Sequence, residues 1–442
     1  MCETRNFMGF PINELTVQSG SGKGGILMQY RTMKKSGDSL SILGYGCMRL
    51  PQNGSRIDEP RARAQLRYAI DHGVNYVDTA IPYHMGASEP FLGRALLDGY
   101  REKVKLATKM PHWNVKKRED MDRFLSGQLA SLQTGRIDYY LVHNMQAESW
   151  KKLKGLGFAD FVAKAKADGR IRNIGFSFHG GTKDLKAIVD DYAWDFCQIQ
   201  FNYLDRDNQA GVEGLKYAAA KGLGVIVMEP LRGGMLARNA SHAIQAIRDE
   251  ADVKRSPAEW ALRWVWNFPE VTVVLSGMNE EAHIEENLRV AGEALPGSLT
   301  EKEISLVDRV REAYLKSMKV GCTGCRYCMP CPAGVDIPAC FETYNTKYLG
   351  GGAGPASIGY VSLVGGAFSG NKPGYASQCK GCGKCEKACP QHLPIRQHLQ
   401  EVRKEFEGPT LPVMFFMVKV VQRFFSWRAT RNASPPAKGG SR

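Results

Sequence analysis

The chain has 442 residues, of which 43% are hydrophobic and 24% charged, and it carries a formal net charge of +14. Such a composition is typical of a globular protein with two or three domains. No apolar run reaches the roughly 18 residues that a transmembrane helix needs. Six Lys or Arg residues, with no acidic residue, gather in residues 408–442, so the charge does not indicate a general nucleic-acid surface.

Residues 1–27 are aperiodic and contain no basic start followed by an apolar run, so we expect a flexible leader and not a secretory signal. Residues 20–25 read GSGKGG, which fits the G-x-G-x-x-G pattern of nucleotide-binding loops. No strand–helix unit surrounds this stretch, so we do not expect it to bind a nucleotide.

Short apolar runs alternate with amphipathic stretches from Ser41 onward. The stretches have helical periodicity, as in residues 61–73, 123–135 and 150–169. The apolar runs are rich in β-branched and aromatic residues and predict eight strands, within 41–46, 74–80, 104–109, 138–144, 172–178, 196–202, 224–230 and 271–277. This alternation predicts an eight-stranded parallel (β/α)8 TIM barrel over residues 28–315. A doubly wound open sheet is the alternative, but no dinucleotide fingerprint follows its first strand.

Four polar side chains follow three neighbouring strands of this barrel, at the ends where barrel enzymes place their chemistry. They are Asp78, Tyr83, Lys109 and His143. Taken singly, each has an ordinary structural explanation, such as a helix cap or a solvated charge. Together they can deliver a proton to a carbonyl oxygen: Lys109 is expected to lower the pKa of the Tyr83 phenol, Asp78 to fix Lys109, and His143 to orient the carbonyl.

These residues, with the segments GYGCMRLP, DTAIPYHMGASEPFLGRAL and GFSFHGG, resemble the aldo-keto reductase family. The resemblance covers the barrel and implies that Asp78, Tyr83, Lys109 and His143 form the family's catalytic tetrad. It also implies reduction of a small carbonyl compound, or oxidation of the alcohol, and a substrate-pocket role for Trp113.

The resemblance implies a nicotinamide pocket that departs from the family pattern. Ser177 is followed by Phe178 where the family usually has Asn, and Met228 stands where an aromatic residue usually stacks on the nicotinamide. Glu280 and Glu281 stand where the family often has cations for a 2′-phosphate, so NADH is expected over NADPH, and a flavin remains an alternative. The expected cofactor-binding residues are Ser177, Gln198, Met228, Leu231, Gly277 and Asn287.

Nine of the twelve cysteines lie between Cys322 and Cys389. Their two-residue gaps, in a chain without a signal peptide, indicate metal binding in a reducing cytoplasm and not disulfides. Two runs, each with a trailing proline, resemble the C-x2-C-x2-C-x3-C-P signature of bacterial ferredoxins. Zinc would need only four thiolates per site and would not explain the third cysteine of each run. The expected ligands of two [4Fe–4S] clusters are Cys322, Cys325, Cys328, Cys331, Cys379, Cys382, Cys385 and Cys389.

The resemblance to two-cluster ferredoxins implies crossed ligation. Cys389 would then complete the cluster of the first run, and Cys331 that of the second. Cys340 could replace Cys331, but it fits a buried thiol on a helix better. Helices are expected after each proline, so we predict a mainly helical ferredoxin-like domain over residues 316–407, with a glycine-rich loop near 349–374 over the barrel mouth.

Residues 411–427 read LPVMFFMVKVVQRFFSW, in which the polar residues fall on one narrow helical stripe. Packing onto the rest of the protein is one interpretation of this tail, which spans residues 408–442. The other is a basic amphipathic helix that makes peripheral contact with an anionic membrane or docks a partner.

The combination resembles a subfamily of aldo-keto reductase-like proteins with a C-terminal 4Fe–4S domain. It predicts an iron–sulfur oxidoreductase that exchanges single electrons with a ferredoxin-like or other redox partner. The alternative is an electron-transfer or docking protein whose barrel is catalytically idle.

Overall fold

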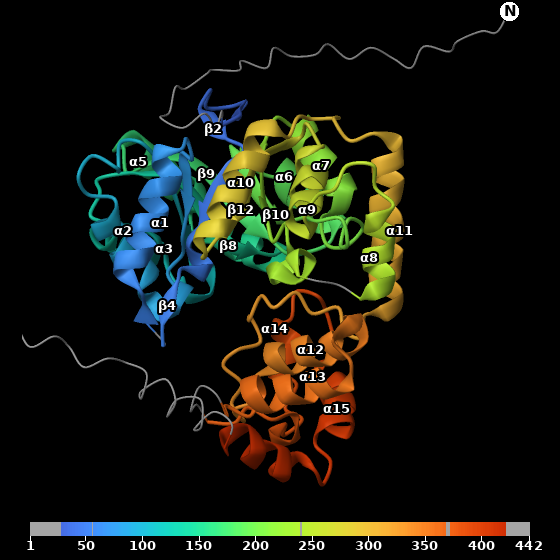
Figure 1. The fold of residues 1–442 in the computed structure, drawn as a ribbon. Coiled ribbons are helices and arrows are strands. Elements are labelled where there is room, and N and C mark those ends of the chain that lie inside the picture. The colour runs from blue at the N-terminus through green and yellow to red at the C-terminus, as the bar shows by residue number, and fades with distance from the viewer. Residues whose placement is uncertain (1–27, 55, 239–240, 368–371, 421–442) are drawn as a thin grey trace, which may run out of the picture. The chain divides into compact units, whose positions relative to one another are not determined.

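The computed structural model describes residues 28–54, 56–238, 241–367 and 372–420 (Figure 1). The expected leader therefore lies outside the described residues. The chain divides into two compact units. The first, here the barrel unit, contains the described part of Met1–Pro230 together with Ala258–Thr300; the second, the C-terminal unit, contains that of Leu231–Pro257 with Glu301–Arg442.

Eight parallel strands close the barrel in chain order, and the last pairs with the first. They are β3 (Leu43–Gly46), β6 (Tyr76–Asp78), β7 (Lys105–Met110), β8 (Ile137–Met145), β9 (Ile171–Phe178), β10 (Phe196–Gln200), β11 (Gly224–Met228) and β12 (Val271–Ser276). Each lies within or overlaps one of the eight predicted runs. The closed order confirms the TIM barrel and excludes the open sheet.

Helices cover the outside of the strands (Figure 1). They are α1 (Glu59–Asp71), α2 (Ser88–Ala95), α3 (Arg118–Ser131), α4 (Ala147–Gly155), α5 (Phe158–Ala167), α6 (Thr182–Asp190), α7 (Gly211–Ala220), α9 (Pro257–Trp266) and α10 (Glu281–Glu293). The single helix expected over residues 150–169 is wrong. Gly157 adopts φ 76°, in the left-handed region, and separates α4 from α5.

A hairpin of β1 (Tyr30–Thr32) and β2 (Ser39–Ser41), which the sequence analysis missed, belongs to the same core as the barrel interior. Its Met33 is fully buried among side chains from the barrel strands, including Tyr76 and Phe196. A Cβ atom on Gly224 would lie 1.8 Å from the Met33 sulfur, so a larger residue at this strand start would force the Met33 side chain to move. The hairpin lies at the N-terminal end of the barrel strands.

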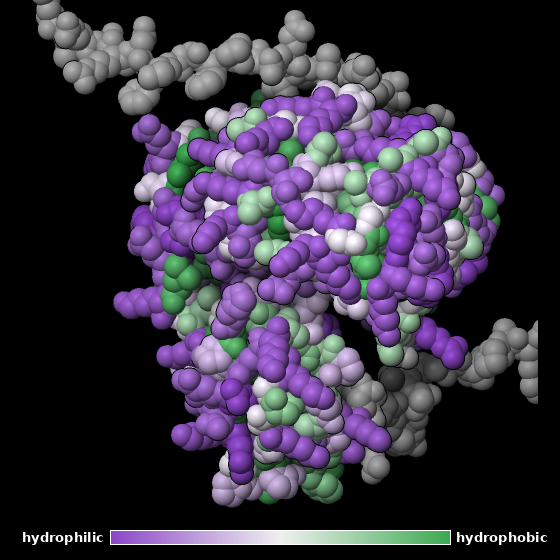
Figure 2. Space-filling model, turned by 180° about the vertical axis from the view of Figure 1, so that it is seen from behind, coloured by the Kyte–Doolittle hydropathy of each residue, from purple (hydrophilic) through white to green (hydrophobic). Residues whose placement is uncertain are grey.

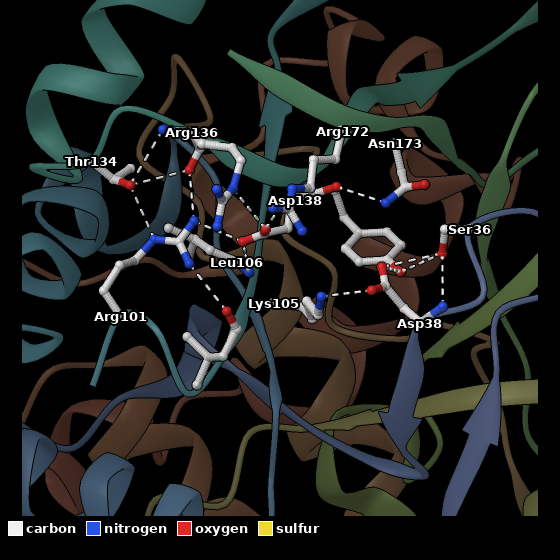
Figure 3. Close-up of polar contacts among 12 residues, drawn as sticks. Ser36, Asp38, Arg101, Lys105, Leu106, Thr134, Arg136, Asp138, Arg172 and Asn173 are labelled. Atoms are coloured by element: carbon white, nitrogen blue, oxygen red, sulfur yellow. Dashed lines mark hydrogen bonds and ion pairs between the residues drawn. The ribbon is translucent and has the colours of Figure 1, made fainter. Parts of the chain in front are cut away.

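Charged side chains gather at the same end of the barrel (Figure 3). Asp138 accepts hydrogen bonds from Arg101 at 2.7 Å and Arg136 at 3.2 Å, and Asp38 accepts one from Lys105 at 2.6 Å. In TIM barrels this end serves stability, while chemistry is placed at the opposite end. The face of the barrel unit in Figure 2 is mainly hydrophilic, with scattered apolar side chains.

The C-terminal unit is helical, as predicted. It contains α8 (His242–Asp249), α11 (Glu301–Ser317), α12 (Ile337–Thr346), α13 (Ala353–Gly359), α14 (Lys384–Ala388) and α15 (Ile395–Phe406). The expected glycine-rich loop is largely helical instead: α13 is flanked by π-helical turns at Lys347–Gly351 and Tyr360–Val364. The reason is burial, because Tyr360 and Val364 enter the core of this unit and Val361 is fully buried.

Residues 411–420 of the tail are helical, and the remainder of the predicted amphipathic segment lies outside the described residues. Leu411 packs against the core of the C-terminal unit. Val413, Phe416, Met417 and Val420 are exposed, by 47–68%. Over the described ranges, no helix is both long and apolar enough to span a membrane.

Candidate functional site

The structure brings Asp78, Tyr83 and Lys109 into direct contact at the C-terminal ends of β6 and β7. The Lys109 ammonium donates to both carboxylate oxygens of Asp78, at 2.6 and 2.7 Å, and to the Tyr83 hydroxyl at 3.3 Å. The His143 ring, on β8, stands perpendicular to the Tyr83 ring with 6.3 Å between centroids. The four residues predicted from strand ends therefore form one cluster.

Burial dominates the electrostatics of this cluster. It raises the pKa of Tyr83 well above the ordinary value for a phenol, and the neighbouring charge of Asp78 raises it further. The Lys109 ammonium acts against this shift from 3.3 Å, and the expectation that it lowers the pKa of the Tyr83 phenol stays a prediction. Burial, with Lys109 nearby, also holds the pKa of His143 well below its usual range. Tyr83 thus keeps its proton, and the His143 imidazole is neutral.

A short turn carries Tyr83 back toward Asp78. Tyr83–Gly86 forms a 3-10 turn in which His84 and Met85 adopt left-handed φ angles of 51° and 55°. Non-glycine residues in that region cost about 1–3 kcal/mol each and persist where contacts enforce them. The His84 ring accepts a hydrogen bond from the Leu50 backbone at 3.1 Å, a contact that sequence reasoning missed. A residue outside the turn, Leu50, therefore helps to fix its conformation.

A buried polar layer lies behind Lys109 and was not predicted. Gln128 donates to the Lys109 carbonyl at 3.1 Å and to Glu89 at 2.8 Å, and Thr108 donates to Glu89 at 2.6 Å. Burial raises the pKa of Glu89. Glu89 lies in the quoted family segment, but nothing in its spacing indicated contact with the strand that carries Lys109.

The aromatic residue expected in the substrate pocket lies beside the tetrad. The Trp113 ring is 44% exposed, with its centroid 5.2 Å from that of His143. Two further histidines, His112 and His179, are close enough to influence His143. Burial lowers the pKa of each to about 4. Their place directly after β7 and β9 was the signal that could have identified them.

Three expected nicotinamide residues lie on adjacent strands. Ser177 on β9 accepts a hydrogen bond from the Asn144 backbone at 2.8 Å, and Gln198 on β10 donates to the Met228 sulfur at 3.6 Å. The Gln198 side-chain oxygen is buried and has no hydrogen-bond partner within the described part of the chain. Because a buried amide oxygen normally has a partner, Gln198 fits the amide of a bound nicotinamide.

The expected adenosine end follows β12. Asn287 donates to Ser276 at 3.0 Å, and a Cβ atom on Gly277 would lie 3.1 Å from Arg49. Arg61 on α1 binds both carboxylates, at 2.5 Å for Glu280 and 2.6 Å for Glu281. One cation therefore partly neutralises two anions. Leu231 follows Met228 by three residues, and its part in this pocket stays a prediction.

The first cysteine run forms one site with the last cysteine of the second run. Cys322, Cys325, Cys328 and Cys389 line one cavity in the C-terminal unit. Burial raises the pKa of Cys328 to about 12, and the nearby thiols of Cys322, Cys325 and Cys389 add to this effect. Four converging thiols fit the ligand set of a [4Fe–4S] cluster with the crossed pattern.

The second run is less complete. Burial raises the pKa of Cys385, the nearby Cys379 adds to this effect, and Cys382 is exposed. No contact places Cys331 beside them within the described residues, so its role stays a prediction. Cys340 is fully buried on α12, and its thiol donates to the Gly374 carbonyl at 3.7 Å. This contact fits the structural thiol that was expected. In the same described ranges, no three His, Cys, Asp or Glu side chains are grouped tightly enough to hold a single metal ion, so the cluster ligation by these cysteines stays a prediction.

Comparisons with known proteins agree with this architecture. The profile of the Aldo/keto reductase family matches residues 42–312, and that of a 4Fe-4S dicluster domain matches residues 321–394. The chain therefore belongs to the Aldo/keto reductase family and carries a 4Fe–4S domain after the barrel. It is an oxidoreductase.

Relatives and solved structures match the barrel portion. Uncharacterized oxidoreductase C215.11c of Schizosaccharomyces pombe is 28% identical, over 60% of this chain and 86% of its own length. Methylglyoxal reductase YeaE of Escherichia coli is 26% identical, over 65% and 96%. The holo form of aldo-keto reductase AKR11C1 from Bacillus halodurans has a TM-score of 0.54 at 25% identity, and the match covers 64% of this chain and 96% of that one.

Proposed function

We propose that this protein interconverts a carbonyl compound and an alcohol on the barrel, and that electrons reach or leave this site through two [4Fe–4S] clusters. The proposal rests on the position of Lys109. Its ammonium donates hydrogen bonds both to the Asp78 carboxylate and to the Tyr83 hydroxyl. The printed name of one relative, methylglyoxal reductase, supports a carbonyl substrate.

Each side chain of the tetrad has one task in this proposal. Tyr83, which holds its proton at neutral pH, donates it to the oxygen of the carbonyl as that oxygen gains charge. Lys109 stabilises the phenolate left behind, and Asp78 keeps Lys109 in place. The neutral His143 imidazole orients the carbonyl oxygen. In the reverse direction the phenolate accepts the proton of the alcohol.

Gln198 and Ser177 would hold the amide of a nicotinamide, which supplies hydride to the carbonyl carbon when bound. We expect NADH to be preferred over NADPH. Glu280 and Glu281 carry two negative charges, and Arg61 supplies one positive charge. This group of three residues, here called the acidic corner, therefore keeps a negative charge and disfavours a 2′-phosphate. A flavin is the alternative cofactor, because it converts between one- and two-electron steps.

The eight cysteines of the two runs would hold the clusters, which supply single-electron transfer when bound. Such transfer implies a redox partner, and a ferredoxin-like protein has the matching chemistry. We place the reaction in a reducing compartment such as the cytoplasm, because every described cysteine is a free thiol. No nucleic acid takes part in the proposal.

The described start of the tail supports peripheral contact with a membrane. Four apolar side chains between Val413 and Val420 are exposed beside Lys419, which is the pattern of an interfacial helix. Co-sedimentation with anionic vesicles should therefore decrease for a variant that ends at Gly408. Equal sedimentation of the two proteins would contradict this contact.

The test of the enzymatic proposal is aldehyde reduction by the anaerobically reconstituted Tyr83→Phe variant. Turnover should fall by about 10²-fold or more, because the proton donor is lost while the ring stays in place. Tyr68→Phe is the matched control, since Tyr68 is 41% exposed on α1, outside the site. Unchanged turnover in Tyr83→Phe would favour the idle-barrel alternative.

A further inference from the structure

A basic surface surrounds the second cysteine run. Lys380, Lys384 and Lys387 alternate with its cysteines, and Arg396 and Arg403 follow on α15. All five side chains are exposed. We infer that this surface, here called the basic port, docks an acidic protein that carries single electrons. The inference rests on the proposed electron transfer and names its entry point and partner chemistry.

The positive charge of the port is largely uncompensated. Residues 379–404 contain six Lys or Arg residues and two Glu residues. Glu386 is paired with Arg396, whose guanidinium donates to it at 2.9 Å. Among described residues, Lys380, Lys384 and Lys387 form no ion pair. Their charges therefore face solvent, where they are available to a partner.

The basic port includes a hollow that is also lined by a cysteine of the second run. A surface hollow in this unit is lined by Cys379, Gly381, His392, Arg396, Gln400 and Arg403. Arg396, Gln400 and Arg403 are spaced four and three residues apart, so they share one face of α15. Cys382 is exposed on the same loop. A protein that covered the hollow would come close to the thiols of the second run, and electron transfer requires such close approach.

The first cysteine run lacks the surrounding basic side chains and the exposed cysteine of the second run. The two runs therefore differ in how well they suit the docking of a partner. Its only charged residue between Cys322 and Cys331 is Arg326, which lies 3.7 Å from Asp336. Cys389, the fourth thiol of its cavity, is buried. The exposed thiol and the basic side chains therefore favour the second run as the site that a partner protein approaches.

An acidic carrier fits this surface better than a neutral or basic one. Opposite charges steer the encounter and fix the orientation, so they act mainly on the association rate and weaken as salt rises. Each productive encounter moves one electron: the carrier is oxidised by one electron and the site of the second run is reduced by one. Two encounters supply two electrons, which a bound flavin would combine for one carbonyl reduction, and two protons, one of them from Tyr83, complete the alcohol.

Stopped-flow association with an acidic bacterial ferredoxin, at low ionic strength and without substrate, tests the port. For Lys384→Glu/Lys387→Glu we expect an association rate roughly tenfold lower than for the wild type, with the difference lost at high salt. The matched control is Lys164→Glu/Lys216→Glu, which reverses two exposed lysines on α5 and α7 of the barrel unit. Its rate should stay within about twofold of the wild type.

Iron content separates an electrostatic effect from loss of the cluster. If the double variant loses iron, Arg403→Glu replaces it, since Arg403 lies on α15, away from any cysteine in sequence. Equal rates for port variants and wild type, or equal slowing of the control, would overturn the inference. So would port variants that lose binding to anionic vesicles but not to ferredoxin. Because no substrate is present, failure of the carbonyl chemistry would leave this result unaffected.

Discussion

The Lys109 ammonium lies 2.6 Å from a carboxylate oxygen of Asp78, and both side chains are almost completely buried. Two opposite charges thus share a site from which water is largely excluded. Removing one partner of such a pair leaves the other charged and uncompensated, which is typically far more costly than losing a surface ion pair. The pair is therefore important for stability as well as for the proposed chemistry.

The first prediction concerns this pair. Lys109→Met should lower the free energy of unfolding by roughly 3–5 kcal/mol, because Asp78 keeps its buried charge without a partner. Denaturant unfolding of the apoprotein measures the change. The double variant Lys109→Met/Asp78→Asn should recover much of the loss while remaining inactive. A double variant as unstable as the single one would show that the charge of Asp78 is not the cause.

Stability should also depend on pH through His179. Burial lowers the pKa of His179 to about 4, whereas an unfolded histidine titrates near 6.5. Between these values the unfolded chain binds more protons, so stability falls as pH falls from about 6.5 toward 4. His179→Gln should remove up to one proton from this dependence, about 1.4 kcal/mol per pH unit. An equal slope in the variant, from denaturant unfolding, would contradict this assignment.

The control for that experiment is His283→Gln. His283 lies on α10 with its side chain exposed to solvent. This variant measures what the loss of an exposed histidine alone does to the pH slope. A loss of slope in both variants would point to a general effect of histidine removal.

Cofactor preference should change at the acidic corner. Glu280→Gln/Glu281→Gln leaves Arg61 unpaired there, so NADPH affinity should rise relative to NADH by about tenfold. Fluorescence titration of the two nucleotides measures the ratio. Arg61→Gln, which leaves both carboxylates, should shift it in the opposite direction. A wild type that prefers NADPH by more than tenfold would refute the role given to these carboxylates.

Crossed ligation predicts a specific loss of iron. The reconstituted wild type should contain about eight irons, and Cys389→Ser should lose the four held with the first run. Cys340→Ser is the matched control and should keep all eight, because its thiol donates to the Gly374 carbonyl. Full iron content in Cys389→Ser, or stoichiometric zinc in the wild type, would contradict the cluster assignment.

Periodicity and strand-end chemistry predicted much of this fold and site, and the failures have physical causes. The eight strands were visible because each is a short apolar run, and Asp78, Lys109 and His143 were found because each ends one. The break between α4 and α5 was not predicted, because the left-handed φ angle of Gly157 depends on local packing and not on the periodicity of the sequence. The residues around Tyr360 were mistaken for a loop because burial outweighs their glycine content.

Long-range contacts were the other limit. Glu89 meets Gln128 across 39 positions of the chain, and Arg61 meets Glu281 across 220. No short-range sequence pattern links the two residues of either pair, so neither contact could be predicted from the sequence. The direction of the pKa shift at Tyr83 was also beyond the sequence, because it depends on how deeply the closed barrel buries the phenol.

The most direct test of the central claim joins the two units in one measurement. The reconstituted protein is reduced by dithionite, freed of excess reductant and mixed with a panel of aldehydes that includes methylglyoxal, while cluster absorbance is followed. The account predicts that at least one aldehyde reoxidises the wild type and that Tyr83→Phe reoxidises at least about 10²-fold more slowly. Equal rates in the two proteins, or aldehyde reduction with no change in the clusters, would contradict it.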